Sequence, residues 1–474
     1  MTNGELTNKE IGRKAVRAAA ALGLRQAFVQ GLNILGGVLL ANLLLPSQFG
    51  VYGIIMFVLM FIGIFGSTGL AANLIRHGTE PTLDEYKSVF TFQQAIVFVT
   101  SILIWVLAPQ IESIYQLPDQ NGWLFRFIAV SMFISSFMVI PQVQLERRLD
   151  FNRLAFAEVF QALIFNLSAV VLAWLNYGVI SFGIAILLRF LTGAIIVNYI
   201  NPWPIGWKVS LKYSMEHLHF GLVFQAGQLV NLFKDSIYPL FIGVAAGSIA
   251  LGFINFAGLM ANLPVMLVAL LNRLYMPMFA RLAKDRESLR LALRTTLIII
   301  CVITYALSSF IFVFRQEIVS LFGEEWLPAV ALFAPLVLIN ILLVPSLVII
   351  AVLNALGKAT YVLKLQLAWA LGNWLLGPLF ILNWGWEAWP WALLVVNFSS
   401  LLAWNLASKL TGLNWWDVLS RPLGGMFAIY LLSSMLELVD TNLTVKMAIA
   451  VLILIGVSLA LLRQELRLIW RLLV

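Results

Sequence analysis

Long apolar runs, separated by short polar connections, follow one another along almost the whole chain. About fourteen of these runs reach the length of roughly 20 residues that an α-helix needs to cross a bilayer. Backbone groups that face lipid must be hydrogen-bonded within their own segment, so such runs predict helices rather than open strands. The runs lie near residues 15–45, 50–75, 88–109, 123–145, 155–175, 179–200, 213–243, 248–275, 290–314, 327–353, 360–383, 388–408, 422–438 and 443–462.

The composition supports a lipid environment. Hydrophobic residues make up 61% of the chain, charged residues make up 11%, and the mean hydropathy is +0.95. Ordinary soluble domains contain about 45–50% apolar and about 25% charged residues. The sequence therefore predicts an all-α polytopic membrane protein with about fourteen transmembrane helices. The N-terminal stretch MTNGELTNKEIGRKAVRAAA lacks the features of a cleaved signal peptide, so we expect the first apolar run to remain as a span.

The basic residues predict the orientation in the membrane. When the N-terminus is placed in the cytoplasm, 24 of the 30 Lys and Arg residues fall on the cytoplasmic side. The opposite side then holds Arg126, Arg315 and Lys446. This bias predicts that both termini are cytoplasmic. The net charge of +8 is thereby accounted for by topology, and no basic stretch is long enough to predict a nucleic-acid-binding domain.

The sequence repeats itself at almost half its length. WLNYGVISFGIAIL at 174–187 is similar to ILNWGWEAWPWALL at 381–394, which lies 207 residues later. Asn and Gly are typical of tight turns, so both copies predict an outer turn between two spans. Three further pairs keep the same order: GLRQAFVQGLN (23–33) with GLVFQAGQLVN (221–231), FGVY (49–52) with LGFI (251–254), and IESI (111–114) with IVSL (318–321).

This repeat predicts two lobes of six spans each, with the same orientation in the membrane. Parallel repeats of this kind are found in transporters that bind their substrate at the interface between the lobes. The predicted N-lobe covers residues 1–206 and the C-lobe covers 207–412. The remaining residues, 413–474, contain two further spans and a basic C-terminal segment.

Polar and charged residues inside the predicted spans are the candidates for function. A charge near the middle of a bilayer costs at least about 2.5–3.5 kcal/mol, so such a residue is a functional candidate by default. Polar side chains also follow one helical face in the first and seventh spans, which the repeat makes equivalent. The candidate substrate-binding residues are Arg25, Gln30, Asn33, Arg189, Gln228, Asn231 and Lys234, with Asp235 as a coupling or charge-balancing group.

The same residues have a second interpretation. Gln and Asn also join packed membrane helices by hydrogen bonds worth about 0.6 kcal/mol each. Arg25 lies close enough to the cytoplasmic end of its span to extend its guanidinium to the interface, and Glu158 lies near the start of another span. If Arg25, Arg189 and Lys234 line a cavity, their preferred ligand is an anion such as a phosphate or a pyrophosphate.

Signals for other chemistries are weak in the sequence. LGKAT (356–360) lacks the upstream Gly and the following hydroxyl of a phosphate-binding loop. His77, His217, His219 and Cys301 do not have the spacing of a metal site. No connection between spans is large enough for a catalytic domain. The sequence thus predicts no cofactor, no metal site and no enzymatic activity.

Three segments resemble the polysaccharide transport family of the multidrug/oligosaccharidyl-lipid/polysaccharide exporter superfamily. LLLPSQFGVYGIIMFVLMF (43–61) is similar to that family's LGP-x-x-FG-x-Y signature. PQVQLERRLDFNRLAFAEV (141–159) is similar to its P-x-x-x-x-x-R-R-x-x-F-R-x-L-A segment. KDSIYPLFIGVAAGSIALGFINFA (234–257) is similar to its seventh span, with Asp235 at the Asp position and Leu251-Gly252 at the LG-x-Y turn.

The chain departs from the family pattern at two places. Ile254 stands where Tyr is usual, and Leu45 is followed directly by Pro46 without the Gly. The resemblance covers about residues 10–412, and it implies twelve core helices in two lobes, often with two more.

By this resemblance, the chain is expected to be a flippase that moves undecaprenyl-pyrophosphate-linked oligosaccharide from the inner to the outer leaflet by alternating access. The implied pathway is O-antigen, exopolysaccharide or capsule biosynthesis, with polymerase and chain-length proteins as possible partners. Sodium, protons and the membrane potential alone stay open as the driving force. The alternatives are a multidrug cation antiporter, a peptidoglycan-precursor flippase and, in a different class, a membrane polysaccharide polymerase or ligase.

Overall fold

The computed structural model of the chain is α-helical, and no strand occurs among the residues that it describes. Those residues are 28–67, 74, 80–115, 122–148, 150–210 and 241–437, with the single positions 449, 452, 453 and 456. Contacts divide the chain into two compact units, Met1–Gly252 (unit 1) and Phe253–Val474 (unit 2).

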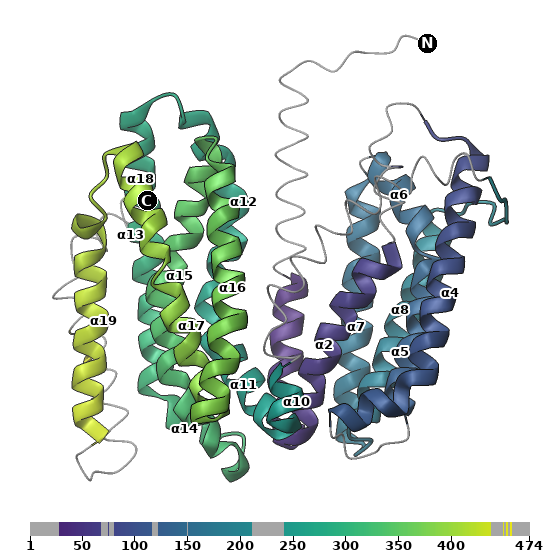
Figure 1. Ribbon diagram of the computed structural model, residues 1–474, viewed down its shortest axis with the longest axis horizontal. Helices are drawn as coiled ribbons and strands as arrows, with labels where there is room; N and C mark the ends of the chain where they lie inside the picture. The colour runs from purple at the N-terminus through teal and green to yellow at the C-terminus, as the bar shows by residue number, and fades with distance from the viewer. Residues whose placement is uncertain are drawn as a thin grey trace. The chain divides into compact units, whose positions relative to one another are not determined.

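Unit 1 is a bundle of long helices (Figure 1). Helix α5 packs against both α4 and α8, and α7 packs against α8. A 42° bend separates α5 from α6, which together make one broken span. The helices of this unit are Phe28–Leu43, α2 (Pro46–Ser67), α4 (Leu83–Ile114), α5 (Trp123–Ser136), α6 (Val139–Arg147), α7 (Phe151–Trp174), α8 (Ile180–Ile200), α10 (Gly243–Ala245) and the first residues of α11 (Gly247–Ala261).

The start of α4 shows how local sequence fixes a helix end. Thr82 precedes the helix and its hydroxyl accepts a hydrogen bond from the backbone N–H of Glu85 at 3.3 Å. The Glu85 carboxylate accepts one in return from the backbone N–H of Thr82 at 2.6 Å. This reciprocal capping box satisfies two backbone donors that the first turn of a helix leaves without partners.

The segment after α8 runs back along α4. Trp203 is buried there, and its ring lies 5.2 Å from the ring of Phe90. The backbone N–H of Ser210 donates to the Ser88 hydroxyl, and the backbone N–H of Lys208 donates to the Thr91 hydroxyl. These contacts hold residues 201–210 of the connection between the predicted lobes on unit 1.

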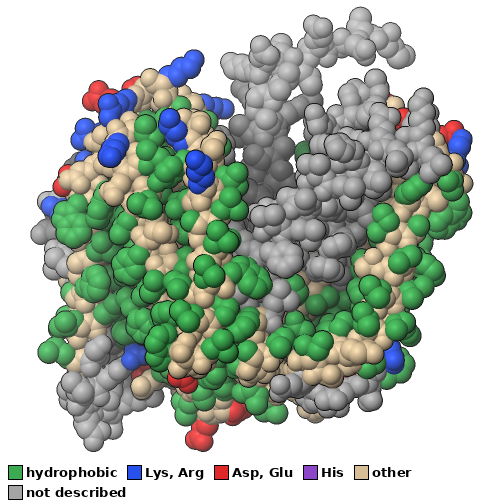
Figure 2. All heavy atoms as spheres, in the orientation of Figure 1, with side chains coloured by type: hydrophobic (Ala, Val, Ile, Leu, Met, Phe, Trp, Pro, Cys, Tyr) green, Lys and Arg blue, Asp and Glu red, His purple; other side chains and the backbone are tan. Residues whose placement is uncertain are grey.

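In unit 2, helix α15 forms the core. It packs against α12, α13, α17 and α18, and 16 of its 26 residues are buried. Figure 2 shows that hydrophobic side chains cover much of the visible flank of this unit, as expected for a surface that faces lipid. The elements are α12 (Leu263–Leu282), α13 (Arg286–Val313), α14 (Arg315–Ser320), η2 (Glu324–Ala329), α15 (Val330–Ala355), α16 (Ala359–Trp384), η3 (Trp386–Ala388), α17 (Trp389–Asn397), α18 (Ser400–Thr411) and α19 (Trp415–Glu437).

The predicted all-α membrane fold is confirmed. Seven helices in the described part of the chain are long and apolar enough to cross a bilayer, or eight when α5 and α6 count as one span. The total of about fourteen stays a prediction, because parts of the expected first, seventh and last spans lie outside the described residues. The predicted boundary between the lobes at 206/207 also stays a prediction. The division between the two compact units falls later in the sequence, after Gly252.

Both copies of the repeated Leu-Asn-aromatic-Gly sequence form turns, as predicted. Asn176 and Gly178 follow α7 with φ values of 63° and 55°, and Gly385 follows α16 with a φ of 84°. Positive φ is easy for Gly and is tolerated by Asn, which explains these residues at helix ends.

The interpretation of Leu251-Gly252 as a turn is wrong. Gly252 lies inside α11, and its counterpart in the repeat, Gly50, lies inside α2. A Cβ atom added to Gly50 would lie 1.8 Å from the carbonyl oxygen of Ser248, and one added to Gly252 would lie 1.9 Å from that of Pro46. These two glycines are therefore required by a close approach of two helices and not by a turn.

Trp326 provides a test of the core of unit 2. It is fully buried, and its ring lies 6.2 Å from that of Phe253 and 4.6 Å from that of Phe256. Truncating a buried Trp to Ala costs about 3–5 kcal/mol, so we expect Trp326→Ala to lower the midpoint of thermal unfolding in detergent markedly. The matched control is Trp384→Ala, because Trp384 is 65% exposed and its loss should leave the midpoint nearly unchanged. Equal effects of the two variants would contradict this description of the core.

Candidate functional site

Three of the predicted site residues fall in the described part of the chain, and all three belong to unit 1. Gln30 and Asn33 lie on the helix Phe28–Leu43, and Arg189 lies on α8. Each is half-buried. The predicted residues Arg25, Gln228, Asn231, Lys234 and Asp235 lie outside the described residues.

Arg189 lies near the middle of α8, between two aromatic rings. Its guanidinium carbon is 5.7 Å from the ring centre of Phe165 on α7 and 5.6 Å from that of Phe190. A cation over an aromatic face gains about 0.5–2 kcal/mol, more when water is excluded. Its Nε atom is buried and has no hydrogen-bond partner among the described residues. An N–H donor is thus available for a ligand at this depth.

Two titratable side chains lie near Arg189, and they come from different helices. Glu158 of α7 carries an opposite charge, and Tyr52 of α2 carries a neutral phenol. The Tyr52 ring packs against Phe182 of α8 at 5.2 Å, which holds α2 beside α8 at this level. Glu158 itself has further partners, so it is not reserved for Arg189. The cation is consequently compensated in part, and not neutralised by one dedicated ion pair.

Asn33 makes a helix-to-helix hydrogen bond. The amide nitrogen of Asn166 on α7 donates to the Asn33 side-chain oxygen at 3.0 Å and to the backbone oxygen of Ala162 at 2.8 Å. This contact supports the packing interpretation of Asn33, and its substrate role stays a prediction. Asn166 is 6% exposed, and its own side-chain oxygen has no partner in the described part of the chain.

Tyr52 and Asn166 are the residues that sequence reasoning missed. Asn166 could have been found by the criterion that identified Arg189, because it is a polar residue within an apolar span. Tyr52 carried none, because a Tyr near the start of a membrane helix is ordinary in an interfacial aromatic belt. We name the set Asn33, Tyr52, Glu158, Asn166 and Arg189 the unit 1 polar cluster.

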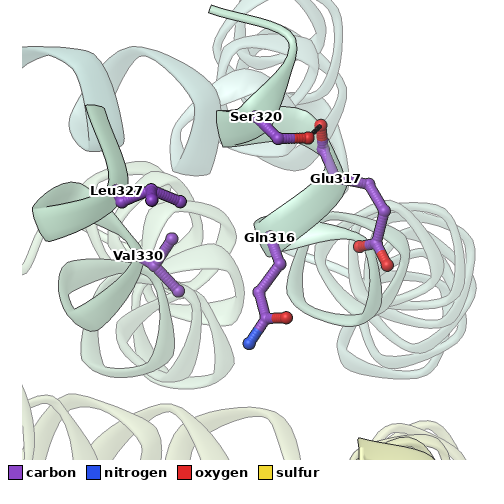
Figure 3. A pocket seen from close by; sticks show the side chains of 5 residues that line it. All are labelled: Gln316, Glu317, Ser320, Leu327 and Val330. Atoms are coloured by element: carbon purple, nitrogen blue, oxygen red, sulfur yellow. Dashed lines mark hydrogen bonds between the residues drawn. The ribbon is translucent and has the colours of Figure 1, made fainter. Parts of the chain in front are cut away.

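Unit 2 carries an open pocket at the end of α14 (Figure 3). Its volume is about 560 Å³, and Gln316, Glu317, Ser320, Leu327 and Val330 line it. The Ser320 hydroxyl donates to the backbone oxygen of Glu317 at 2.9 Å. No group of three His, Cys, Asp or Glu residues able to hold a metal occurs among the described residues, here or elsewhere. The sequence did not predict this pocket, and it holds none of the predicted site residues.

These features define a polytopic helical membrane protein with a charged cluster inside one bundle. A family profile described as "Polysaccharide biosynthesis protein" matches residues 39–331. The chain belongs to this family, in agreement with the resemblance found in the sequence.

Curated relatives agree with this assignment. The chain is 26% identical over 290 residues to the teichuronic acid biosynthesis protein TuaB of Bacillus subtilis (strain 168), covering 60% of this chain and 59% of TuaB. It is 21% identical over 362 residues to the succinoglycan biosynthesis transport protein ExoT of Rhizobium meliloti (strain 1021), covering 75% of this chain and 70% of ExoT. The chain thus spans about three fifths to seven tenths of the length of these relatives.

The fold is similar to that of a solved flippase. The lipid II flippase MurJ, in an inward closed conformation, superposes with a TM-score of 0.72 at 15% identity, over 95% of this chain and 100% of MurJ. At this identity the likeness shows the shared fold of an all-α polytopic membrane protein.

The hydrogen bond between Asn33 and Asn166 predicts an energetic coupling between the two residues. In a double-mutant cycle of Asn33→Ala and Asn166→Ala, we expect a coupling of about 0.6 kcal/mol in the free energy of unfolding. Asn33→Ala combined with Asn383→Ala is the control, because Asn383 is exposed in unit 2 and bonds within its own helix. A coupling of zero in the first cycle would show that the hydrogen bond adds nothing to the packing.

Proposed function

We propose that this protein is a flippase that moves undecaprenyl-pyrophosphate-linked oligosaccharide from the inner to the outer leaflet by alternating access. The process served is the biosynthesis of O-antigen, exopolysaccharide or capsule. The observation that carries the proposal is Arg189, an arginine near the middle of a membrane helix with an unpartnered Nε. Membership of the polysaccharide biosynthesis family supports the glycan pathway, and the name of ExoT, a transport protein, supports transport over enzymatic activity.

Arginine suits a pyrophosphate head group in both charge and geometry. Its planar guanidinium presents several N–H donors that match phosphate oxygens, and it stays charged at any physiological pH. In unit 1 the flanking rings of Phe165 and Phe190 limit access of water, which strengthens a phosphate contact. The lipid tail remains in the bilayer while the head group crosses.

The membrane potential favours the proposed direction. A pyrophosphate head group of charge about −2 is repelled by the negative interior, so its outward movement gains about 2.3 kcal/mol per charge per 100 mV. The potential is therefore a sufficient driving force in principle, and a coupling role for Asp235 stays a prediction.

The close helix approach at Gly50 and Gly252 supports alternating access. These residues are equivalent in the repeat, and α2 and α11 touch there with almost no space between their backbones. Small residues at a membrane helix interface let two backbones meet without a large apolar surface between them. We infer that this contact opens and closes during transport.

The proposed setting is the bacterial cytoplasmic membrane with both termini cytoplasmic. The distribution of described cations supports this orientation, since Arg147 and Arg148 end α6 and Arg153 begins α7 on one side of unit 1. Its partners are the lipid-linked oligosaccharide and membrane lipid, with polymerase and chain-length proteins of the same pathway as further candidates.

Substitution of Arg189 tests the proposed function. In proteoliposomes with an imposed potential, we expect Arg189→Ala to slow transbilayer movement of a labelled undecaprenyl-pyrophosphate oligosaccharide at least about tenfold, a loss of about 1.4 kcal/mol. Arg189→Lys keeps the charge but loses the planar fork, so its rate should be intermediate. Arg153→Ala is the control, because this exposed arginine pairs with Asp150, three residues earlier, and its rate should stay within twofold of wild type.

Other results would redirect the assignment. Movement of lipid II in preference to the glycan substrates would identify a peptidoglycan-precursor flippase. Proton-driven export of an organic cation, without movement of any lipid, would identify a multidrug antiporter. If Arg189→Ala and Arg189→Lys both move the lipid at the wild-type rate, the protein is still a flippase, but Arg189 is not part of its substrate site.

Substitution of the two glycines tests the gating contact. Gly50→Ala and Gly252→Ala each place a methyl group against a backbone oxygen, so we expect the contact to open and transport to fall about tenfold. A cysteine at Ser248, which is 7% exposed, should then react faster with a membrane-impermeant maleimide in a Cys301→Ser background. Gly424→Ala is the control, since a Cβ there meets nothing within 4 Å. Unchanged labelling and unchanged transport would contradict a moving contact.

A further inference from the structure

Lys and Arg residues gather at one end of unit 2, at the top of Figure 2, and acidic residues lie at its opposite end. The cations come from five different helices and from the connections before α13 and α16, and all of them are exposed. Three acidic residues, Asp285, Glu287 and Asp417, share this end. The exposed cations are Arg281, Lys284, Arg286, Arg290, Arg294, Lys358, Lys364, Lys409 and Arg421.

Three of the helices that carry these cations, α13, α18 and α19, are in contact with one another or joined through α13. Helix α13 packs against α18 and α19. The guanidinium of Arg286 at the start of α13 donates to the backbone oxygen of Lys409 at 3.1 Å, which ties it to the last turn of α18. We name the exposed cations of these three helices, Arg286, Arg290, Arg294, Lys409 and Arg421, the basic rim.

The basic rim lies where the head groups of a bilayer would be. Helix α13 has 28 residues and is about 42 Å long, whereas the hydrocarbon core is about 30 Å thick. Arg286, Arg290 and Arg294 occupy its first turns at intervals of four residues, so about 6 Å separates successive positions on nearly one face. Helix α13 has no charged residue after Arg294, so its charged turns extend beyond the hydrocarbon and into the head-group layer.

One of the acidic residues at this end, Asp285, is engaged in local hydrogen bonds. The Asp285 carboxylate accepts hydrogen bonds from the Ser288 hydroxyl at 2.6 Å and from the backbone N–H groups of Ser288 and Glu287. These bonds, led by that of the Ser288 side chain, hold the pKa of Asp285 below its usual value. Asp285 is consequently committed to capping α13, and the five exposed cations of the rim outnumber the three acidic residues at this end.

Tryptophans accompany the cations of the basic rim, and exposed apolar side chains follow toward the hydrocarbon. Trp415 lies 5.5 Å from both Trp404 and Trp416, and Trp416 is 57% exposed at the start of α19. Further along the same helices, Ile303 of α13 is 41% exposed and Phe427 of α19 is 56% exposed. Cations and tryptophans at the end of the helices, followed by exposed apolar residues, match the order of interface and acyl chain in a phospholipid.

We propose that the basic rim is a binding site for anionic phospholipids of the leaflet that it faces, separate from the unit 1 polar cluster. Charge complementarity selects the phosphate, and the apolar side chains below select a lipid over a soluble anion. In the orientation proposed above, this leaflet is the inner one. Each Lys or Arg near an anionic membrane surface contributes about 1 kcal/mol of attraction, so several together discriminate anionic from zwitterionic lipid.

The experiment titrates phosphatidylglycerol into the purified full-length protein in a neutral detergent and counts bound lipids by native mass spectrometry. The rim variant is Arg290→Gln, Arg294→Gln and Arg421→Gln together, and it leaves Arg286 to cap α18. We expect its half-saturating lipid concentration to rise at least about tenfold. The control variant is Arg153→Gln, Lys358→Gln and Lys364→Gln, which removes the same charge from exposed positions outside the rim and should shift binding less than twofold.

A second variant separates loss of the site from loss of the fold. Arg290→Lys, Arg294→Lys and Arg421→Lys keeps the charges and should retain lipid binding within about threefold, and all variants should unfold at the wild-type temperature in detergent. Equal weakening by the rim and control variants would overturn the proposal, because binding would then follow net charge alone. Displacement of the lipid by millimolar inorganic phosphate would also overturn it, since the rim would then be a site for soluble anions.

Discussion

The guanidinium of Arg189 lies near the middle of a membrane helix, where an uncompensated charge is costly. Unit 1 lowers this cost through the faces of Phe165 and Phe190 and through the charge of Glu158, and the neutral phenol of Tyr52 lies nearby. These groups belong to α2, α7 and α8, so the compensation depends on how the three helices pack. A movement of any one of them changes the stability of the charge, and this makes the electrostatics of the cluster sensitive to conformation.

Neutral polar side chains inside the membrane also need compensation, and they obtain it through hydrogen bonds. Asn340 in α15 is 1% exposed, and its amide donates to the backbone oxygen of Ala261 and to the Ser308 hydroxyl. The Asn33–Asn166 pair likewise joins two helices of unit 1. Such bonds fix helices at a small energetic gain, because an amide finds partners within the protein. Arg189 differs in keeping an unpartnered donor, and this separates a candidate ligand contact from a structural hydrogen bond.

The sequence predicted those features that depend on short stretches of chain. Spans follow from apolar length, and the turn at Asn176 and Gly178 follows from residues that tolerate positive φ. The role of Gly252 was misjudged because its reason is a contact with Pro46, about 200 residues earlier, which no local pattern records. Tyr52 was missed for a similar reason, since its importance comes from α8 and not from its neighbours in sequence. Arg189 was found because a charge in an apolar span stands out without knowledge of the fold.

Helix α2 brings the two proposed elements of transport together. Gly50 and Tyr52 are two residues apart, which places them about 3 Å apart along the helix and on nearly opposite faces. Gly50 meets α11 on one face, and Tyr52 packs against α8 beside Arg189 on the other. A ligand shifts a conformational equilibrium only by its difference in affinity between the two states. If α2 moves when the glycine contact opens, Tyr52 moves relative to Arg189, and the affinity of the cluster for an anion changes with it. The movement of a single helix, α2, then gives the two conformations different affinities for the anion, as alternating access requires.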